Sequence, residues 1–130
     1  MIRPLIIAVF CVLLADGPAT AAGGPTIDPS KIVTPKFSAK QRLGKLAYDA
    51  KCAVCHGKDT AGTNTGPPFL HKVYHPGHHG DASFFRATVQ GARAHHWPFG
   101  DMPKVEGVSK PMIINIIKYV RAMQKANGIF

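Results

Sequence analysis

The sequence predicts an all-α fold of three to four helices joined by long loops. Three segments carry apolar residues at helical spacing, and each lies between residues that favour the start and the end of a helix. The chain also contains 13 Gly and 11 Pro, which suits a small fold with long loops better than a sheet-rich core. Its 130 residues are enough for one domain.

The N-terminal segment 1–21 has the features of a secretory signal peptide. Arg3 supplies a positive start, an apolar run extends over residues 5–15, and residues 19–21 match the small-x-small cleavage pattern. The apolar run has about half of the ~20 residues that a membrane-spanning helix needs; a retained membrane anchor is the alternative. We therefore expect a protein exported to the periplasm, without a stable membrane span after cleavage.

Residues 22–37 predict an extended N-terminal arm ahead of a folded domain at 38–130. The arm is rich in Gly, Pro and Thr and shows no apolar periodicity. It therefore carries no signal for a helix or a strand of its own.

The first helix is expected to begin after Ser38. Ser38 and Gln41 form an S-x-x-Q pattern, which is typical of a capping box at a helix N-terminus. The residues expected on its apolar face are Leu43, Leu46, Ala47 and Ala50. The helical pattern continues directly into Cys52.

Two further helices follow. The second is expected to have Asp81 as its N-cap and to stop at Gly91. The third is expected to start at Ser109, with Pro111 tolerated in the first turn, and to end at residues 127–128. The expected apolar faces comprise Phe84, Phe85, Thr88 and Val89 in the second helix, and Ile113, Ile116, Ile117, Val120 and Met123 in the third.

Two long loops separate these helices, over residues 57–80 and 92–108. Loops of this length are uncommon inside a small domain unless they serve a function. A large prosthetic group acting as part of the core would account for both of them.

The sequence Cys52-Ala53-Val54-Cys55-His56 indicates that this group is haem, because Cys-x-x-Cys-His is the signature of covalent haem attachment. Two thiols must reach the two vinyl groups on one edge of the porphyrin, and the next residue must place an imidazole over the iron. One helical turn brings Cys52, Cys55 and His56 to the same side. His56 would then be the proximal iron ligand.

These residues have two other interpretations. A redox-active C-x-x-C usually follows a strand in a βαβ unit, and no alternating strand pattern precedes this one. A zinc site needs two more strong ligands; no second C-x-x-C exists, although the six other histidines outside the motif could supply them.

A haem iron also needs a sixth ligand. Met112 and Met123 occupy core positions of the last expected helix, so they are explained by packing. Met102 lies in a loop between a glycine and a proline, where a methionine has little to pack against, and it is the expected ligand. Its main rivals are His95 and His96.

With these residues in place, the chain resembles the class I c-type cytochromes over residues 38–129. Gly44 and Tyr48 lie eight and four residues before the first cysteine of the haem motif. In that family, a glycine and an aromatic residue at these positions let the first helix cross the last one closely. Ile116 and Tyr119 resemble their partners on the last helix.

The resemblance implies a cytochrome c fold wrapped around one covalently bound haem c. Pro67, in Thr65-Gly66-Pro67, resembles the family proline whose carbonyl accepts the inner ring N–H of the haem histidine. Leu70 resembles the apolar residue that packs on the haem, and Met102-Pro103 resembles the axial methionine segment. The implied cofactor-binding residues are Cys52, Cys55, His56, Pro67, Leu70 and Met102, with His56 and Met102 as iron ligands.

Six histidines make the loops unusual, namely His71, His75, His78, His79, His95 and His96. We expect these side chains to be solvated or to form hydrogen bonds at the haem edge. The alternative is that they bind a second metal such as copper or zinc. The second helix spans ~13 Å, so histidines at its two ends could share an ion only if the loops fold back. Trp97 and Phe99 are expected to line the haem pocket.

The expected function is that of an electron carrier, not an enzyme. A formal charge of +9, which is unchanged by loss of Arg3 and Asp16, suits docking to redox partners with an acidic surface. Nucleic acid is not an expected partner for an exported haem protein. Two alternatives remain: a haem subunit of a larger periplasmic oxidoreductase or oxidase, with the arm and the histidine loops as interface, or an open-site haem enzyme or sensor if Met102 does not bind iron.

Overall fold

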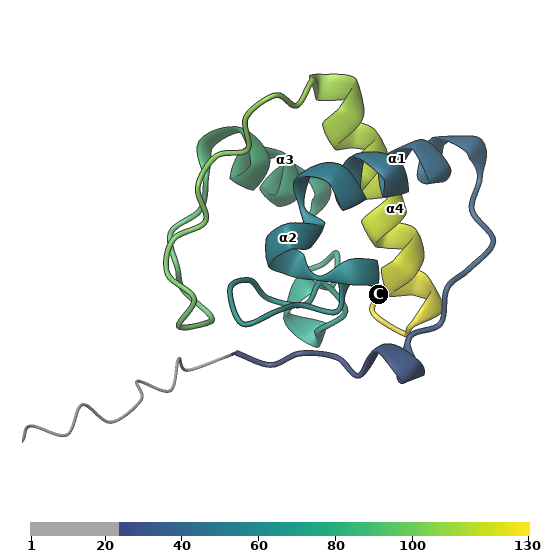
Figure 1. Cartoon of the computed structure of the whole chain (residues 1–130), viewed down its shortest axis with the longest axis horizontal. Coiled ribbons are helices and arrows are strands. Elements are labelled where there is room, and N and C mark those ends of the chain that lie inside the picture. Colours follow the sequence, from purple (N-terminus) through teal and green to yellow (C-terminus); the bar gives the residue numbers. More distant parts are fainter. Residues whose placement is uncertain (1–23) are drawn as a thin grey trace, which may run out of the picture.

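The structure is a computed structural model that describes residues 24–130. The predicted signal peptide at 1–21 lies outside the described residues. The helices are η1 (Pro29–Lys31), α1 (Ala39–Lys51), α2 (Ala53–His56), η2 (Lys58–Thr60), η3 (Lys72–Tyr74), α3 (Asp81–Gln90) and α4 (Lys110–Ala126) (Figure 1). Residues 24–130 contain no β-strand, only an isolated antiparallel bridge between Ala92 and Met102. The predicted all-α fold is confirmed.

Helix α1 begins where its capping box predicts. Ser38 Oγ accepts a hydrogen bond from the Gln41 backbone N–H at 3.4 Å, and Gln41 Oε1 accepts one from the Ser38 N–H at 2.8 Å. The predicted apolar face is wrong at Leu43 and Leu46, whose side chains are 57% and 68% exposed, although Ala47 does pack against the core. The face that is buried carries Gly44 and Tyr48.

Gly44 explains why that face is the buried one. α1 and α4 make the most extensive contact between helices in the described chain. A Cβ atom at Gly44 would overlap the backbone carbonyl of Asn115, so only glycine permits this approach. Next to it, the Tyr48 and Tyr119 rings pack with their centroids 5.2 Å apart. The close crossing expected at Gly44 is confirmed.

Helix α4 supplies most of the hydrophobic core. Ser109 is its N-cap and accepts from the Met112 N–H, Pro111 lies in the first turn, and Asn127 is the C-cap. All five residues of the predicted apolar stripe are buried. The core cluster consists of Tyr48, Leu70, Ile116, Tyr119, Val120 and Met123.

Helix α3 differs from its prediction at the N-terminus. Gly80 is the N-cap, and Asp81 is the first helical residue. The Asp81 carboxylate does not cap the helix because it accepts a hydrogen bond from Arg121 Nε of α4 at 2.8 Å. Gly91 ends the helix with a φ of 81°, as predicted. Val89, expected on the apolar face, is 46% exposed.

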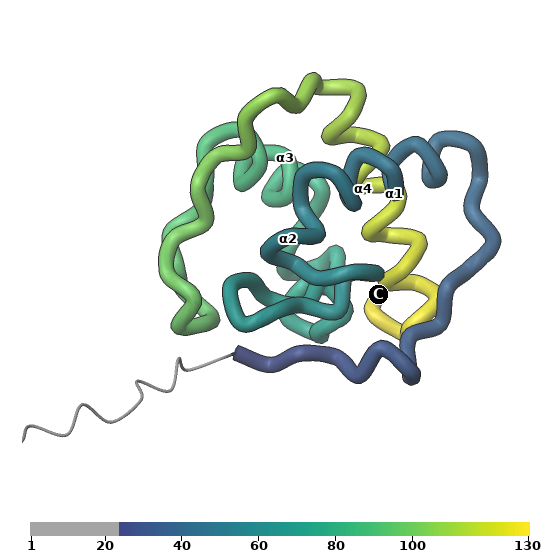
Figure 2. The backbone as a smooth tube through the Cα atoms, viewed as in Figure 1, coloured from purple at the N-terminus to yellow at the C-terminus, as the bar shows by residue number. Residues whose placement is uncertain are grey.

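The arm is extended apart from η1, and its residues 24–37 run along the domain before reaching α1 (Figure 2). The Asn127 side chain donates to the Val33 carbonyl and accepts from the Val33 N–H, both at 2.8 Å. The Ile27 N–H donates to the Ala61 carbonyl at 2.8 Å. Phe37 packs edge-on against Tyr119. The described part of the arm is therefore bound to the domain that follows it.

None of the helices in residues 24–130 has both the length and the apolar character that crossing a membrane requires.

Candidate cofactor site

A cavity of about 460 Å³ lies between α2, α3, α4 and the loop that follows α3. Its volume falls in the range of small-molecule and cofactor sites. Apolar side chains from three helices form much of its wall, including Phe84, Ile116 and Val120. The predicted site residues that line it are Cys52, Cys55, His56, Pro67 and Met102. The fold thus brings together five of the six residues that the sequence singled out.

The imidazole of His56 is buried and held in one orientation. Its Nδ1 lies 3.0 Å from the Pro67 carbonyl oxygen. A carbonyl only accepts, so Nδ1 carries the hydrogen and Nε2 keeps its lone pair. Burial lowers the pKa of His56, and the Pro67 hydrogen bond opposes this effect only in part. The side chain is therefore set up as a neutral imidazole, the form that binds metals.

The backbone next to His56 is held just as firmly. The Tyr48 hydroxyl lies 3.1 Å from the His56 carbonyl and 2.8 Å from that of Gly57. The Gly62 N–H donates to the His56 carbonyl at 2.7 Å. A Cβ at Gly66 would lie 2.6 Å from the Cys55 carbonyl oxygen, so this loop packs directly on the haem motif. Together these contacts fix the place of the imidazole.

Both cysteines are half-buried in the cavity wall. Cys52 lies at the bend between α1 and α2, with a φ of −120°. Burial, followed by the neighbouring Cys55, raises the pKa of the Cys52 thiol to about 11. A thiol that stays protonated at neutral pH is unlike the low-pKa nucleophile of a redox dithiol. This argues against a thioredoxin-type role.

A zinc site at the haem motif has no support in the described chain. Within residues 24–130, the group of ligating side chains that could hold an ion is made of three histidines and includes neither cysteine.

Met102 reaches the cavity from the loop after α3. Its backbone exchanges two hydrogen bonds with Ala92, at 2.9 and 2.8 Å. Gly91 packs so closely on it that a Cβ there would lie 2.6 Å from the Met102 carbonyl oxygen. The position of this methionine is thus determined by a short hairpin-like contact. The rivals His95 and His96 line the same cavity from exposed positions.

Trp97 and Phe99 line the cavity, as the sequence predicts. The indole Nε1 of Trp97 is buried and makes no hydrogen bond of good geometry among the described residues, although it lies close enough to the Tyr74 hydroxyl to oppose the rise that burial causes in the pKa of Tyr74. An unpaired buried N–H costs about 1–3 kcal/mol, and a carboxylate on a bound cofactor would pair it. Haem carries two such carboxylates, so the residues present fit this group.

Leu70 is placed differently from the other predicted site residues. It lies in the hydrophobic core, 6% exposed, and does not line the cavity. Its neighbour Phe69 does, and stacks on the His56 imidazole with ring centroids 4.2 Å apart. Sequence reasoning missed Phe69. Its place directly after Pro67-Pro68 was the available signal for a residue near the haem motif. Side chains in a loop do not alternate regularly, so this signal could not tell Phe69 from Leu70.

Comparison with known proteins agrees with this geometry. The family model described as Cytochrome c matches residues 41–124, which is most of the chain and includes the haem motif, Pro67 and Met102. A search of curated proteins finds no match. The chain therefore belongs to the cytochrome c family, whose members bind covalently attached haem c with its iron.

Proposed function

We propose that this protein is a periplasmic electron carrier with one haem c, whose iron has His56 and Met102 as axial ligands and cycles between Fe(II) and Fe(III). One observation carries the proposal. The Pro67 carbonyl fixes the tautomer of His56 and leaves Nε2 as the ligating atom, in a cavity that Met102 and both thiols also line.

Each residue then has a defined task. Cys52 and Cys55 hold the group through thioether bonds, so that it stays bound in both redox states. When bound, haem c supplies an iron that takes up and releases one electron. The Met102 thioether raises the reduction potential relative to two histidine ligands. Phe69 and the apolar wall exclude water from the site.

This arrangement favours a carrier over an enzyme, because two protein ligands leave the iron no open position for a substrate. It also suits docking to a partner. The chain carries a formal charge of +9. Lys51, Arg93 and Lys104 lie at the cavity wall together with Glu106, which pairs with Lys104, so the wall keeps a net positive charge. An acidic redox partner would be attracted to this surface. Val54, which lies in the cavity wall and is 80% exposed, offers apolar area for the same contact, whether it is transient or part of a larger complex.

The ligand assignment is tested by replacing Met102 with Ala. The ferric wild-type protein is expected to show the weak far-red absorption band that identifies methionine-ligated c-type haem, and Met102→Ala is expected to abolish it. Met112→Ala, on half-buried α4 surface outside the cavity wall, is the matched control and should keep the band.

Two results would overturn the assignment. Persistence of the band in Met102→Ala would place another methionine on the iron. A wild-type protein without the band would point to His95 or His96 if it is low-spin, and to an open-site enzyme or sensor if it is high-spin.

A further inference from the structure

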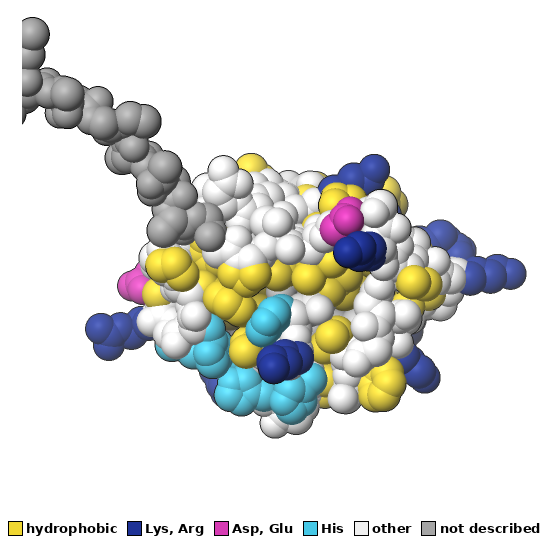
Figure 3. Space-filling view, turned by 90° about the horizontal axis from the view of Figure 1, so that it is seen from below, with side chains coloured by type: hydrophobic (Ala, Val, Ile, Leu, Met, Phe, Trp, Pro, Cys, Tyr) yellow, Lys and Arg dark blue, Asp and Glu magenta, His cyan; other side chains and the backbone are white. Residues whose placement is uncertain are grey.

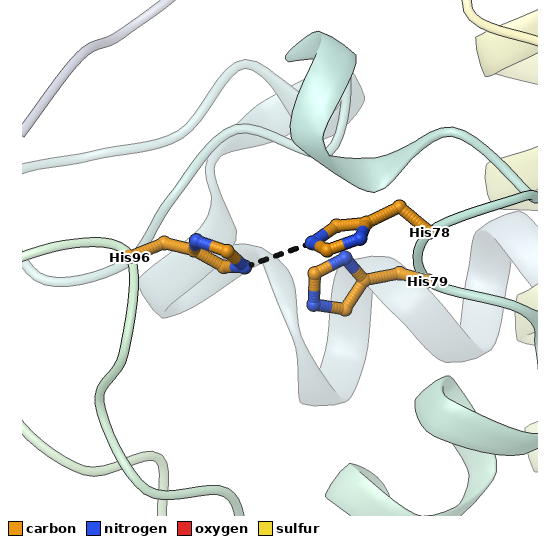
Figure 4. A group of neighbouring side chains, drawn as sticks. All are labelled: His78, His79 and His96. Atoms are coloured by element: carbon orange, nitrogen blue, oxygen red, sulfur yellow. Dashed lines mark hydrogen bonds between the residues drawn. The ribbon is translucent and has the colours of Figure 1, made fainter.

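Three histidines outside the haem motif converge on one point. His78 and His79 precede α3 and His96 follows it, yet each offers a ring nitrogen within 4.8 Å of the others (Figure 4). The loop after α3 folds back through the Ala92–Met102 contact, which returns His96 to the start of the helix. The loops therefore bring together histidines that the length of α3 would otherwise hold apart. Figure 3 shows histidine side chains gathered on one face of the molecule.

The spacing within this cluster suits a tetrahedral metal ion. Two imidazole nitrogens at ~2.0–2.1 Å from such an ion lie ~3.3–3.4 Å apart. Nε2 of His78 and Nε2 of His96 are 3.3 Å apart and share a hydrogen bond that a bound ion would replace. The distance between these two nitrogens already matches that of two ligands of one ion.

The third histidine is oriented by its surroundings. Nδ1 of His79 lies 2.8 Å from the Val73 carbonyl oxygen, so Nδ1 carries the hydrogen and Nε2 keeps the lone pair. Metal-binding histidines commonly donate their other ring N–H to a carbonyl in this way. His95 stands beside the cluster, with its ring centroid 4.3 Å from that of His96 and its own Nδ1 bonded to the Arg93 carbonyl. A water molecule or His95 can complete the coordination.

The chemistry of the donors selects the ion. Imidazole nitrogens suit zinc, copper and nickel, whereas Mg²⁺ and Ca²⁺ require oxygen ligands. The cluster includes no carboxylate. We propose that His78, His79 and His96 form a binding site for one divalent late transition-metal ion, at the edge of the cavity that His79 and His96 also line and distinct from the haem iron. Zn²⁺ fits the tetrahedral spacing, and Cu²⁺ binds the same donors more tightly by the usual order of affinities.

The test uses the haem-containing protein, cleared of metal with a chelator and dialysed against Zn²⁺. We expect one bound zinc per haem iron by elemental analysis. His78→Asn and His96→Asn should each weaken binding at least about tenfold, since even losing an outer partner of a metal ligand costs ~10–100-fold. Both side chains are exposed, so neither change threatens the fold.

His71→Asn is the matched control. It removes one imidazole from the same loop but outside the cluster, and asparagine can replace the His71 cap of the Val73 N–H. Zinc affinity should be unchanged in this variant. Bound Cu²⁺ should show hyperfine coupling to imidazole nitrogen in its electron paramagnetic resonance spectrum, and the coupling should weaken in the cluster variants.

The proposal fails if zinc does not bind stoichiometrically, or if His71→Asn loses as much affinity as the cluster variants. It also fails if His96→Asn changes the axial ligation of the haem, because His96 would then be an iron ligand. Haem content and spectra are measured separately from zinc binding, so this failure is distinguishable from failure of the electron-carrier proposal.

Discussion

At the scale of single residues, His56 shows how a few contacts prepare an imidazole for metal binding. The Pro67 carbonyl sets which nitrogen carries the hydrogen, and Phe69 covers one face of the ring. Burial keeps the imidazole neutral by lowering its pKa. Because Pro67 and Phe69 both belong to the loop that follows the haem motif, the imidazole is oriented by the fold and does not depend on the haem motif alone.

Trp97 provides a test of cofactor contact at this scale. If its buried Nε1–H donates to a carboxylate of bound haem, Trp97→Phe should destabilise the haem-containing protein by about 1–3 kcal/mol through the lost hydrogen bond. Chemical unfolding followed at the Soret band measures this change. Phe99→Leu, at another aromatic position of the cavity wall, is the control for lost packing without a lost donor.

The sign of the change in unfolding free energy in Trp97→Phe decides whether the Trp97 N–H is paired by haem. If the N–H stays unpaired in the haem-bound protein, removing it would be neutral or stabilising, which would contradict the proposed contact.

At the scale of helices, α1 has a start that local sequence predicts and a buried face that it does not. The start of α1 follows from Ser38 and Gln41, which lie three residues apart, so local sequence contains the whole interaction. The buried face of α1 depends on what α4 presents to it. Leu43 and Leu46 are the more apolar residues, but the close contact needs Gly44. Hydrophobicity alone therefore selects the wrong side.

Gly44→Ala tests that crossing. The new Cβ would overlap the Asn115 carbonyl, which belongs to the backbone and cannot rotate away. We expect a loss of about 3 kcal/mol in the free energy of unfolding, at the upper end of overpacking effects. Thermal or denaturant unfolding of the haem-containing protein measures it.

Gly80→Ala is the matched control for Gly44→Ala. Gly80 has an ordinary φ of −66°, and a Cβ there would come no closer than 3.5 Å to its nearest neighbour. Its cost should stay within about 1 kcal/mol. Equal losses in the two variants would show that the crossing is not specially tight.

At the scale of the whole molecule, the cavity explains the long loops. Residues from α2, α3, α4 and the loop after α3 face the cavity. Many apolar side chains of these elements therefore point into the cavity and not only toward another helix. A chain this small buries a limited core by itself. We therefore expect bound haem to serve as part of the core as well as the redox group.

Removing both thiols tests whether the fold depends on the bound haem. In Cys52→Ser/Cys55→Ser, we expect no haem to remain on the chain in a denaturing gel, and a lower helical signal by circular dichroism with a less cooperative thermal transition. Each single variant, with one thioether left, should fall between the double variant and the wild type.

Haem retained on the double variant in the gel would place the attachment elsewhere. Full helicity and a cooperative transition without haem would show that the fold does not rely on the cofactor.

The sequence by itself determined the three longer helices, the caps of α1 and α4 and the haem motif, because these depend on residues within one or two turns of each other. It also singled out Met102 from its loop context and Pro67 through the family resemblance, and both line the cavity. Only the tertiary structure decided that Phe69 and not Leu70 faces the cavity, and that His78 and His96 lie 3.3 Å apart. The physical reason is the same in both cases: in a loop, the direction of a side chain is set by distant contacts and not by a local period.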